Sequence, residues 1–331
     1  MPAADVKRGG AAARLGQNMI ISPCSSHAAL EPRWNPRWDT DEARAGRLAG
    51  YSTYIRNNKD LLATVTSSDS LPATHQHSPG STNTAFSRDI TRRNTPDPRA
   101  NTMAPKILII LTSTRTLRGT DKKTGWYLSE LAHPFDVLHT KAQLIVASPH
   151  GGEAPLDPAS LDAGKDDPIC QAFFAEQKHI WEDTHKLSDL VSRSGEFDAV
   201  FYPGGHGPMF DLVDDPSSIR IAADVYAAGK PVAAVCHGPA ALLNVNSPAA
   251  TPILKDRKVT GFSDKEEGIM QFTSHMPFSL EKRLGEKSAG GYVKADADFG
   301  EKVVVDGNVI TGQNPASAKG VGEALAKALN I

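Results

Sequence analysis

Short apolar runs alternate with amphipathic stretches along residues 103–331. This pattern predicts strands at 106–111, 143–147, 198–202, 231–235, 258–261, 302–305 and 308–311, and helices at 123–139, 170–176, 217–228, 238–243, 277–286 and 317–329. Continuously apolar strands are typical of a parallel sheet that is buried on both faces. We therefore predict an α/β domain with a doubly wound, mostly parallel sheet sandwiched by helices. The Asp306-Gly307 pair between the last two strands predicts a hairpin at the edge of the sheet.

The first 102 residues differ in kind from the rest of the chain. They carry 13 Lys and Arg against 9 Asp and Glu, whereas residues 103–331 carry 23 against 29. From residue 66 to residue 102 the only large apolar side chains are Leu71, Phe86 and Ile90, too few to offset the entropy lost on folding. We predict a largely disordered extension at 1–102 and a catalytic domain at 103–331. We expect the extension to be either a transit segment or an artefact of start-site choice.

Composition and spacing exclude several classes of protein. The net charge of −2 gives no indication of nucleic-acid binding, and no apolar run approaches the ~20 residues of a membrane-spanning helix. The three cysteines fit a reducing compartment, so we expect the protein in the cytoplasm and also in the nucleus. If the extension is a transit segment, we expect it in the mitochondrion instead. The chain has neither HExxH nor CxxC spacing, and we predict no dedicated metal site and no cofactor.

Cys236 directly follows the predicted strand at 231–235 and precedes Gly238 and Pro239. A sharp turn between a strand and a helix, known as a nucleophile elbow, exposes the side chain at the turn to the substrate. The positive end of the following helix should favour the thiolate, which is the reactive form. The plainer alternative is a buried structural cysteine. The adjacent His237 and the glycine favour the nucleophile.

Two other segments follow predicted strands and could contribute to the same site. Gly204-Gly205-His206 forms a loop whose backbone amides could bind a developing oxyanion. Glu130 lies in an apolar helical segment, and if it faces inward, burial should raise the pKa of its carboxyl and make it a general acid or base. Because the carboxyl ends of parallel strands meet at one edge of a sheet, we expect this loop, Glu130 and Cys236 to form one site.

Seven segments of the chain together resemble a known family. They are Leu-Thr-Ser at 111–113, Lys-Thr-Gly-Trp-Tyr-Leu-Ser-Glu-Leu-Ala-His-Pro-Phe at 123–135, Ala-Ser-Pro-His-Gly-Gly at 147–152, Pro-Gly-Gly-His-Gly at 203–207, Ala-Val-Cys-His-Gly-Pro at 234–239, Thr-Gly-Phe-Ser-Asp at 260–264 and Thr-Gly-Gln-Asn-Pro-Ala-Ser at 311–317. The chain resembles the ThiJ/PfpI family of the class I glutamine amidotransferase-like superfamily, in particular its branch of heat-shock chaperones and glutathione-independent glyoxalases (glyoxalase III). The resemblance covers about residues 103–331.

The resemblance implies a flavodoxin-like fold and a catalytic role for each matching residue. Cys236 would be the nucleophile, and Glu130 would be the carboxyl that donates and accepts protons beside it. His237 would be the partner histidine. The acid that orients this histidine would be Glu267, with Glu266 as the fallback, because two acidic residues stand in a row.

The resemblance also implies a reaction and its partners. Gly204, Gly205 and His206, with the His237 amide, would bind the oxyanion of the substrate. The substrate would be a small 2-oxoaldehyde such as methylglyoxal, which would be converted to D-lactate through a Cys hemithioacetal and a Glu proton shuttle. This reaction would detoxify reactive aldehydes, and the enzyme would be a homodimer. Three alternatives remain: a stress-inducible holdase chaperone, a cysteine peptidase or amidase, and a glutamine amidotransferase domain, which would need a synthetase partner.

Overall fold

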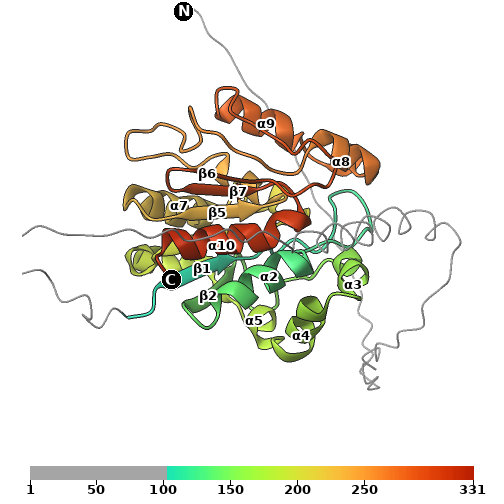
Figure 1. Ribbon diagram of the computed structural model, residues 1–331, viewed down its shortest axis with the longest axis horizontal. Helices are drawn as coiled ribbons and strands as arrows, with labels where there is room; N and C mark the ends of the chain where they lie inside the picture. Colours follow the sequence, from blue (N-terminus) through green and yellow to red (C-terminus); the bar gives the residue numbers. More distant parts are fainter. Residues whose placement is uncertain (1–102) are drawn as a thin grey trace, which may run out of the picture. The chain divides into compact units, whose positions relative to one another are not determined.

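Seven strands in the described part of the chain form one sheet in the order β3-β2-β1-β4-β5-β7-β6 (Figure 1). The computed structural model describes residues 103–331, so the extension predicted at 1–102 lies outside the described residues. The strands are β1 (Lys106–Ile110), β2 (Gln143–Ser148), β3 (His185–Lys186), β4 (Ala199–Tyr202), β5 (Val232–Val235), β6 (Val303–Asp306) and β7 (Val309–Gly312). Every neighbouring pair is parallel except β6 with β7, which confirms the mostly parallel sheet.

Helices cover both faces of this sheet. The helices of the described residues are α2 (Leu128–Leu138), α3 (Pro158–Gly164), α4 (Pro168–Glu176), α5 (His179–Glu182), α6 (Leu187–Leu190), α7 (Pro216–Ala227), α8 (Asp264–Ile269), α9 (Leu280–Lys287) and α10 (Ala318–Ala328). Helices α2 and α10 pack against each other on one face (Figure 1). The β4-α7-β5 unit runs along the sheet in the opposite direction to β1-α2-β2, so its right-handed connection places α7 on the other face.

The central strands are buried throughout because both faces are covered. All four residues of β4 and all four of β5 are buried, as the continuous apolar runs predict. The predicted hairpin is confirmed as β6 and β7 at the sheet edge, with Gly307 at a φ of 60° in its turn.

The observed elements differ from the predicted ones where pairing with distant segments determines the backbone conformation. The helix predicted at 123–139 begins only at Leu128, because Lys123 and Trp126 form bridges to other segments. The strand predicted at 258–261 is a single bridge at Val259. The helix predicted at 238–243 is a short 3-10 turn, η4 (Gly238–Leu242). Elements α3, α5, α6, α8 and β3 were not predicted, because they are short and their apolar patterns are brief.

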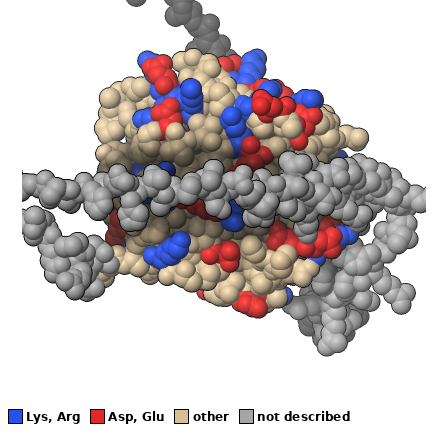
Figure 2. All heavy atoms as spheres, in the orientation of Figure 1, with Lys and Arg blue, Asp and Glu red and all other residues tan. Residues whose placement is uncertain are grey.

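Acidic and basic side chains are interspersed on the face of the described domain that Figure 2 shows. On this visible face they do not gather into one extended patch of a single sign. Among the described helices, none combines the length and the hydropathy that crossing a bilayer requires.

Candidate active site

The site lies at the carboxyl ends of three adjacent strands, β1, β4 and β5. Glu130 is in α2, which follows β1, while Gly204 is the second residue after β4 and Cys236 comes directly after β5. The structure therefore brings together the three segments that the sequence places at strand ends.

Cys236 occupies a strained backbone position at the end of β5. Its φ is 61°, in the left-handed region that a non-glycine residue adopts at a cost. Its N–H donates to Gly312 O at 3.0 Å, and its carbonyl accepts from Phe262 N–H at 2.9 Å. These two bonds hold the predicted elbow, and they leave the side chain buried, with 3% of the residue exposed.

His237 connects the cysteine to an acid. Its Nδ1 lies 3.3 Å from Cys236 Sγ, and its Nε2 lies 2.6 Å from Glu267 Oε2. Burial lowers the pKa of His237, and the Glu267 carboxylate opposes that effect. The imidazole is therefore neutral near pH 7 and can accept a proton from the thiol.

Glu266 and Glu267 have separate positions in α8. Glu266 forms a capping box with Ser263, and its Oε1 accepts hydrogen bonds from the backbone of Phe299 and from two side-chain amides, those of Gln313 and Asn314. It is thus occupied in holding the start of α8. Glu267 is the acid that contacts His237, and its two histidine neighbours outweigh burial and hold the pKa of its carboxyl well below the ordinary value.

Glu130 is fully buried beside the thiol. Burial raises the pKa of its carboxyl to about 8, against the opposing effects of the Cys236 thiol and the Gly204 amide, and the nearby carboxyl of Asp157 raises it further. Its Oε2 accepts the Gly204 N–H at 2.7 Å, whereas its Oε1 is buried with no hydrogen-bond partner among residues 103–331. An unpaired oxygen in an apolar site can exchange a proton with a bound substrate.

The Gly204-Gly205-His206 loop is used differently from the prediction. The Gly204 N–H is committed to Glu130, so it supports the carboxyl instead of facing the space where an oxyanion would form. The Gly205 N–H is directed at the Cys236 sulfur. Gly205 has a φ of 80°, and a Cβ there would overlap the carbonyl oxygen of Gly125, so this close approach requires glycine.

His206 contacts the acid of the site. Its Nε2 lies 2.9 Å from Glu267 Oε1, so the two carboxylate oxygens each contact one histidine. The ring of Phe272 lies over His206 at a centroid distance of 4.7 Å, and Lys122 Nζ lies 5.3 Å from the centre of the same phenyl ring. Sequence reasoning missed Phe272 and Asp157, because neither lies in a segment with a recognisable chemical pattern.

The Cys236 thiol is not acidic in this arrangement, so the expected preference for thiolate is wrong. Burial raises the pKa of the thiol well above its ordinary value, the Glu130 carboxyl raises it further, and the Gly205 N–H only partly opposes this. The η4 turn that follows has five residues, too few to supply a strong dipole. A base must therefore remove the proton as the sulfur reacts.

His206, His237 and Glu267 also have the donor types of a metal site, and their ligand atoms lie within 4.8 Å of one another. In this structure His206 and His237 each contact one oxygen of Glu267. Cys236, His237 and Glu267 follow one another as a thiol, a base and an acid, which suits addition of sulfur to a carbonyl carbon.

The chain is similar in sequence and fold to proteins of one known family. The model of the DJ-1/PfpI family matches residues 178–328. The chain is 34% identical over 222 residues to glyoxalase 3 of Candida albicans, covering 64% of this chain and 93% of that protein. It is 29% identical over 231 residues to a glutathione-independent glyoxalase of Saccharomyces cerevisiae, covering 65% and 94%. The crystal structure of glyoxalase III from Candida albicans aligns with a TM-score of 0.61 at 33% identity, covering 68% of this chain and 97% of that one.

Proposed function

The chain belongs to the DJ-1/PfpI family, and we propose that it is a glutathione-independent glyoxalase that converts methylglyoxal to D-lactate. The observation that carries the proposal is the buried Glu130 carboxyl beside the Cys236 thiol, with one carboxyl oxygen unpaired among the described residues. A hydrolase that acts through a cysteine needs no second carboxyl at this position. An isomerisation through an enediol does, because a proton must move between two adjacent carbons.

The first step joins the substrate to the cysteine. Cys236 Sγ attacks the aldehyde carbon, a C–S bond forms, and the thiol proton passes to His237 Nδ1, 3.3 Å away. The Glu267 carboxylate stabilises the imidazolium that results. The proton then moves to the new alkoxide, which gives a hemithioacetal and returns the imidazole to its neutral form.

The second step moves hydrogen between the two carbons. The ionised Glu130 carboxylate removes the proton from the former aldehyde carbon, and the electron pair of the C–H bond forms the double bond of an enediol as the ketone oxygen takes a proton from solvent. Glu130 then returns its proton to the neighbouring carbon, and the hydroxyl on the sulfur-bearing carbon releases one to solvent. The product is a lactoyl thioester on Cys236, an isomer of the hemithioacetal. The Gly205 amide, which faces the sulfur, lies where it can stabilise negative charge on the adjacent oxygen.

The third step releases the product. Water attacks the thioester carbon, His237 accepts its proton, and the C–S bond breaks to give lactate. The sulfur then recovers a proton from the imidazolium. The sum of the three steps is methylglyoxal plus water giving lactate and a proton, with no change in the protein.

The surface favours this reaction over a holdase chaperone as the main activity. A holdase needs a contiguous exposed apolar patch. Within residues 103–331 the exposed large apolar side chains are Met103, which precedes β1, Ile269 in α8 and Val305 in β6.

We also propose that residues 103–331 carry the whole activity, because every residue of the site lies in this range. The homodimer and the cytoplasmic location remain predictions, the first from the family resemblance and the second from the cysteine content. Cys170 and Cys236 are both free thiols, which agrees with a reducing compartment.

The direct test is D-lactate formation by the full-length chain from methylglyoxal without glutathione. We expect one D-lactate for each methylglyoxal consumed, measured with a stereospecific lactate dehydrogenase, and no L-lactate. Consumption of methylglyoxal without lactate would mean that the thiol only traps the aldehyde. Activity on casein or amino-acid amides in place of methylglyoxal would favour the peptidase or amidase alternative.

The rate should rise with pH between pH 6 and pH 8. Because the pKa of Glu130 is raised to about 8, the carboxylate that removes the carbon-bound hydrogen is the minor form below that pH. We expect kcat/KM to increase roughly tenfold per pH unit below pH 8 and to level off above it. Burial lowers the pKa of His237, so this imidazole loses its proton at a lower pH than a free histidine and does not oppose the rise in rate toward pH 8. A profile that is flat from pH 6 to pH 8 contradicts the assignment of Glu130 as the base.

A further inference from the structure

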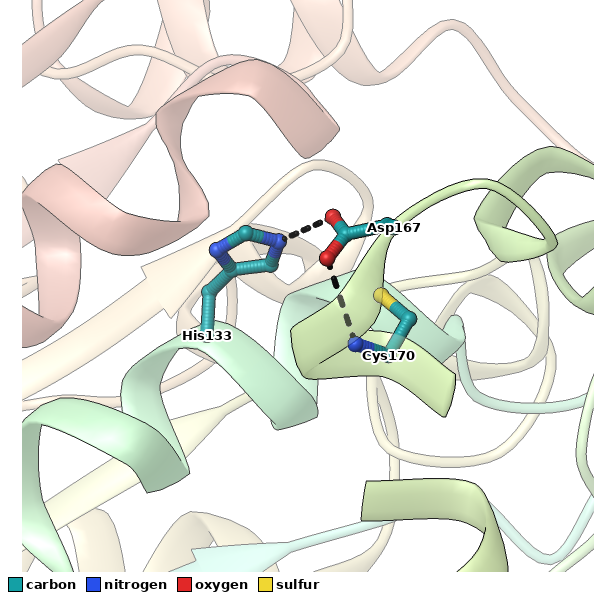
Figure 3. A group of neighbouring side chains, drawn as sticks. All are labelled: His133, Asp167 and Cys170. Atoms are coloured by element: carbon teal, nitrogen blue, oxygen red, sulfur yellow. Dashed lines mark hydrogen bonds and ion pairs between the residues drawn. The ribbon is translucent and has the colours of Figure 1, made fainter. Parts of the chain in front are cut away.

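A second cluster of polar side chains lies between α2 and α4, apart from the site around Cys236. His133 comes from α2, Asp167 is the N-cap residue of α4, and Cys170 lies in the first turn of α4 (Figure 3). His133 Nε2 lies 2.7 Å from Asp167 Oδ2, and one nitrogen, one oxygen and the sulfur of the three side chains all lie within 4.8 Å of one another. The fold thus gathers three different metal-ligating atoms from two helices.

Helix capping accounts for only part of this cluster. Asp167 Oδ1 accepts the N–H groups of Ile169 at 2.9 Å and Cys170 at 3.3 Å, which is an ordinary N-cap. The cap requires neither a histidine at the second oxygen nor a thiol beside it. The two backbone bonds do hold the carboxylate in one orientation, with Oδ2 facing His133 (Figure 3), as hydrogen bonds to ligating carboxylates do in metal sites.

The three donors differ in depth. Cys170 is fully buried, whereas the side chains of His133 and Asp167 are 21% and 31% exposed. The sulfur therefore lies at the base of the cluster, and the nitrogen and oxygen lie nearer to solvent, from which an ion can enter. His133 Nδ1 is buried and has no hydrogen-bond partner among the described residues, so Asp167 provides the polar contact of this ring.

We propose that His133, Asp167 and Cys170 bind a zinc ion, with water as the fourth ligand. A thiolate, an imidazole and a carboxylate together favour zinc over the oxygen-seeking Mg²⁺ and Ca²⁺. Tetrahedral zinc separates ligating nitrogen and oxygen by roughly 3.4 Å, so the 2.7 Å contact between His133 and Asp167 would open by less than about 1 Å. Zinc displaces the thiol proton, which passes to solvent, and it binds Nε2 in the His133 tautomer that carries its proton on Nδ1 instead of donating from Nε2 to Asp167.

Zinc at this position would link α2 to α4 without touching the reacting atoms. Helix α2 also carries Glu130, three residues before His133. Helix α4 carries Phe173, whose ring contacts Trp126 and Phe135 at centroid distances of 6.5 and 5.0 Å. The ion therefore has a structural role that stabilises the side of the domain from which Glu130 projects, and the proposal does not depend on the substrate of the enzyme.

The test uses full-length protein stripped of metal and titrated with Co²⁺ and then with Zn²⁺ against a chromogenic chelator. We expect a thiolate-to-cobalt charge-transfer band and one zinc equivalent that depends on this cluster. Cys170→Ser should abolish the band, and His133→Gln and Asp167→Asn should each weaken zinc binding at least about tenfold. Asn caps helices as well as Asp does, so Asp167→Asn keeps α4 intact.

Matched variants separate this site from other thiols, carboxylates and imidazoles. Asp166→Asn changes the exposed neighbour of Asp167, His179→Gln changes an exposed histidine, and Cys236→Ser changes the second buried thiol of residues 103–331, so all three should keep the cobalt band and the zinc affinity. Absence of the band in the wild type overturns the proposal. So does a band that survives Cys170→Ser, or zinc affinity that is unchanged in all three cluster variants while circular dichroism shows them folded.

Discussion

Replacing Cys236 with alanine should lower the rate of D-lactate formation by about 10³-fold or more. In the proposed reaction the sulfur makes the only covalent bond between protein and substrate, and loss of this nucleophile removes the whole path through the thioester. The backbone at this position is left-handed and already strained with a side chain present, so alanine introduces no new strain. The measurement is the initial rate of the full-length variant at saturating methylglyoxal, with circular dichroism to establish that it is folded.

Cys24→Ala is the matched control, because Cys24 lies outside the residues that carry the site, and it should keep the wild-type rate. The same Cys236→Ala protein also separates the two functions of the family branch. If it has lost lactate formation but still suppresses aggregation of an unfolded client, the chain carries a holdase activity that is independent of the chemistry. Lactate formation at the wild-type rate in Cys236→Ala would exclude the covalent route.

The central part of the fold follows from the sequence because burial there is uniform. The continuous apolar runs at β1, β4 and β5 predict buried parallel strands, and residues at the carboxyl ends of such strands must lie near one another. This is why the Glu130, Gly204 and Cys236 segments could be assigned to one site before the structure was known. The short elements at 152–196 lack a long apolar period, so their boundaries depend on tertiary packing.

The choice between Glu266 and Glu267 depended on a local signal. Ser263 and Glu266 have the spacing of a capping box, which commits Glu266 to the start of α8 and leaves Glu267 for the histidine. The sequence contains this signal, and recognising it predicts α8 as well. His206 is different, because its contact with Glu267 joins the loop after β4 to helix α8, 61 residues along the chain, and no spacing rule indicates it.

Two features of the structure could not be predicted from the spacing of residues along the chain: the pKa of one thiol and a cluster of side chains from two helices. The thiol of Cys236 follows a strand and precedes a turn, which suggested a thiolate, but complete burial and the neighbouring Glu130 raise its pKa instead. The cluster of His133, Asp167 and Cys170 joins residues on two helices, so metal-binding motifs that depend on close spacing along the chain do not detect it.

Replacing Glu130 with glutamine should have the second large effect, a fall in kcat of about 10²–10⁴-fold. Glutamine has almost the same shape, and its carbonyl oxygen can still accept the Gly204 N–H that Glu130 Oε2 accepts now. The variant should therefore fold and should still add methylglyoxal to Cys236. It cannot remove the hydrogen from the former aldehyde carbon, because a neutral amide is not a base.

This separation makes the Glu130→Gln variant informative about mechanism as well as rate. The hemithioacetal should accumulate, so the intact mass of the protein should increase by one methylglyoxal while lactate formation nearly stops. Glu176→Gln, an exposed position on α4, should behave as the wild type. If Glu130→Gln forms lactate at the wild-type rate, another group moves the proton. A folded Glu130→Gln variant that forms neither adduct nor lactate would show that Glu130 is needed for the addition of sulfur to the aldehyde. In that case the buried carboxyl and the buried thiol share a proton before the sulfur attacks the carbonyl.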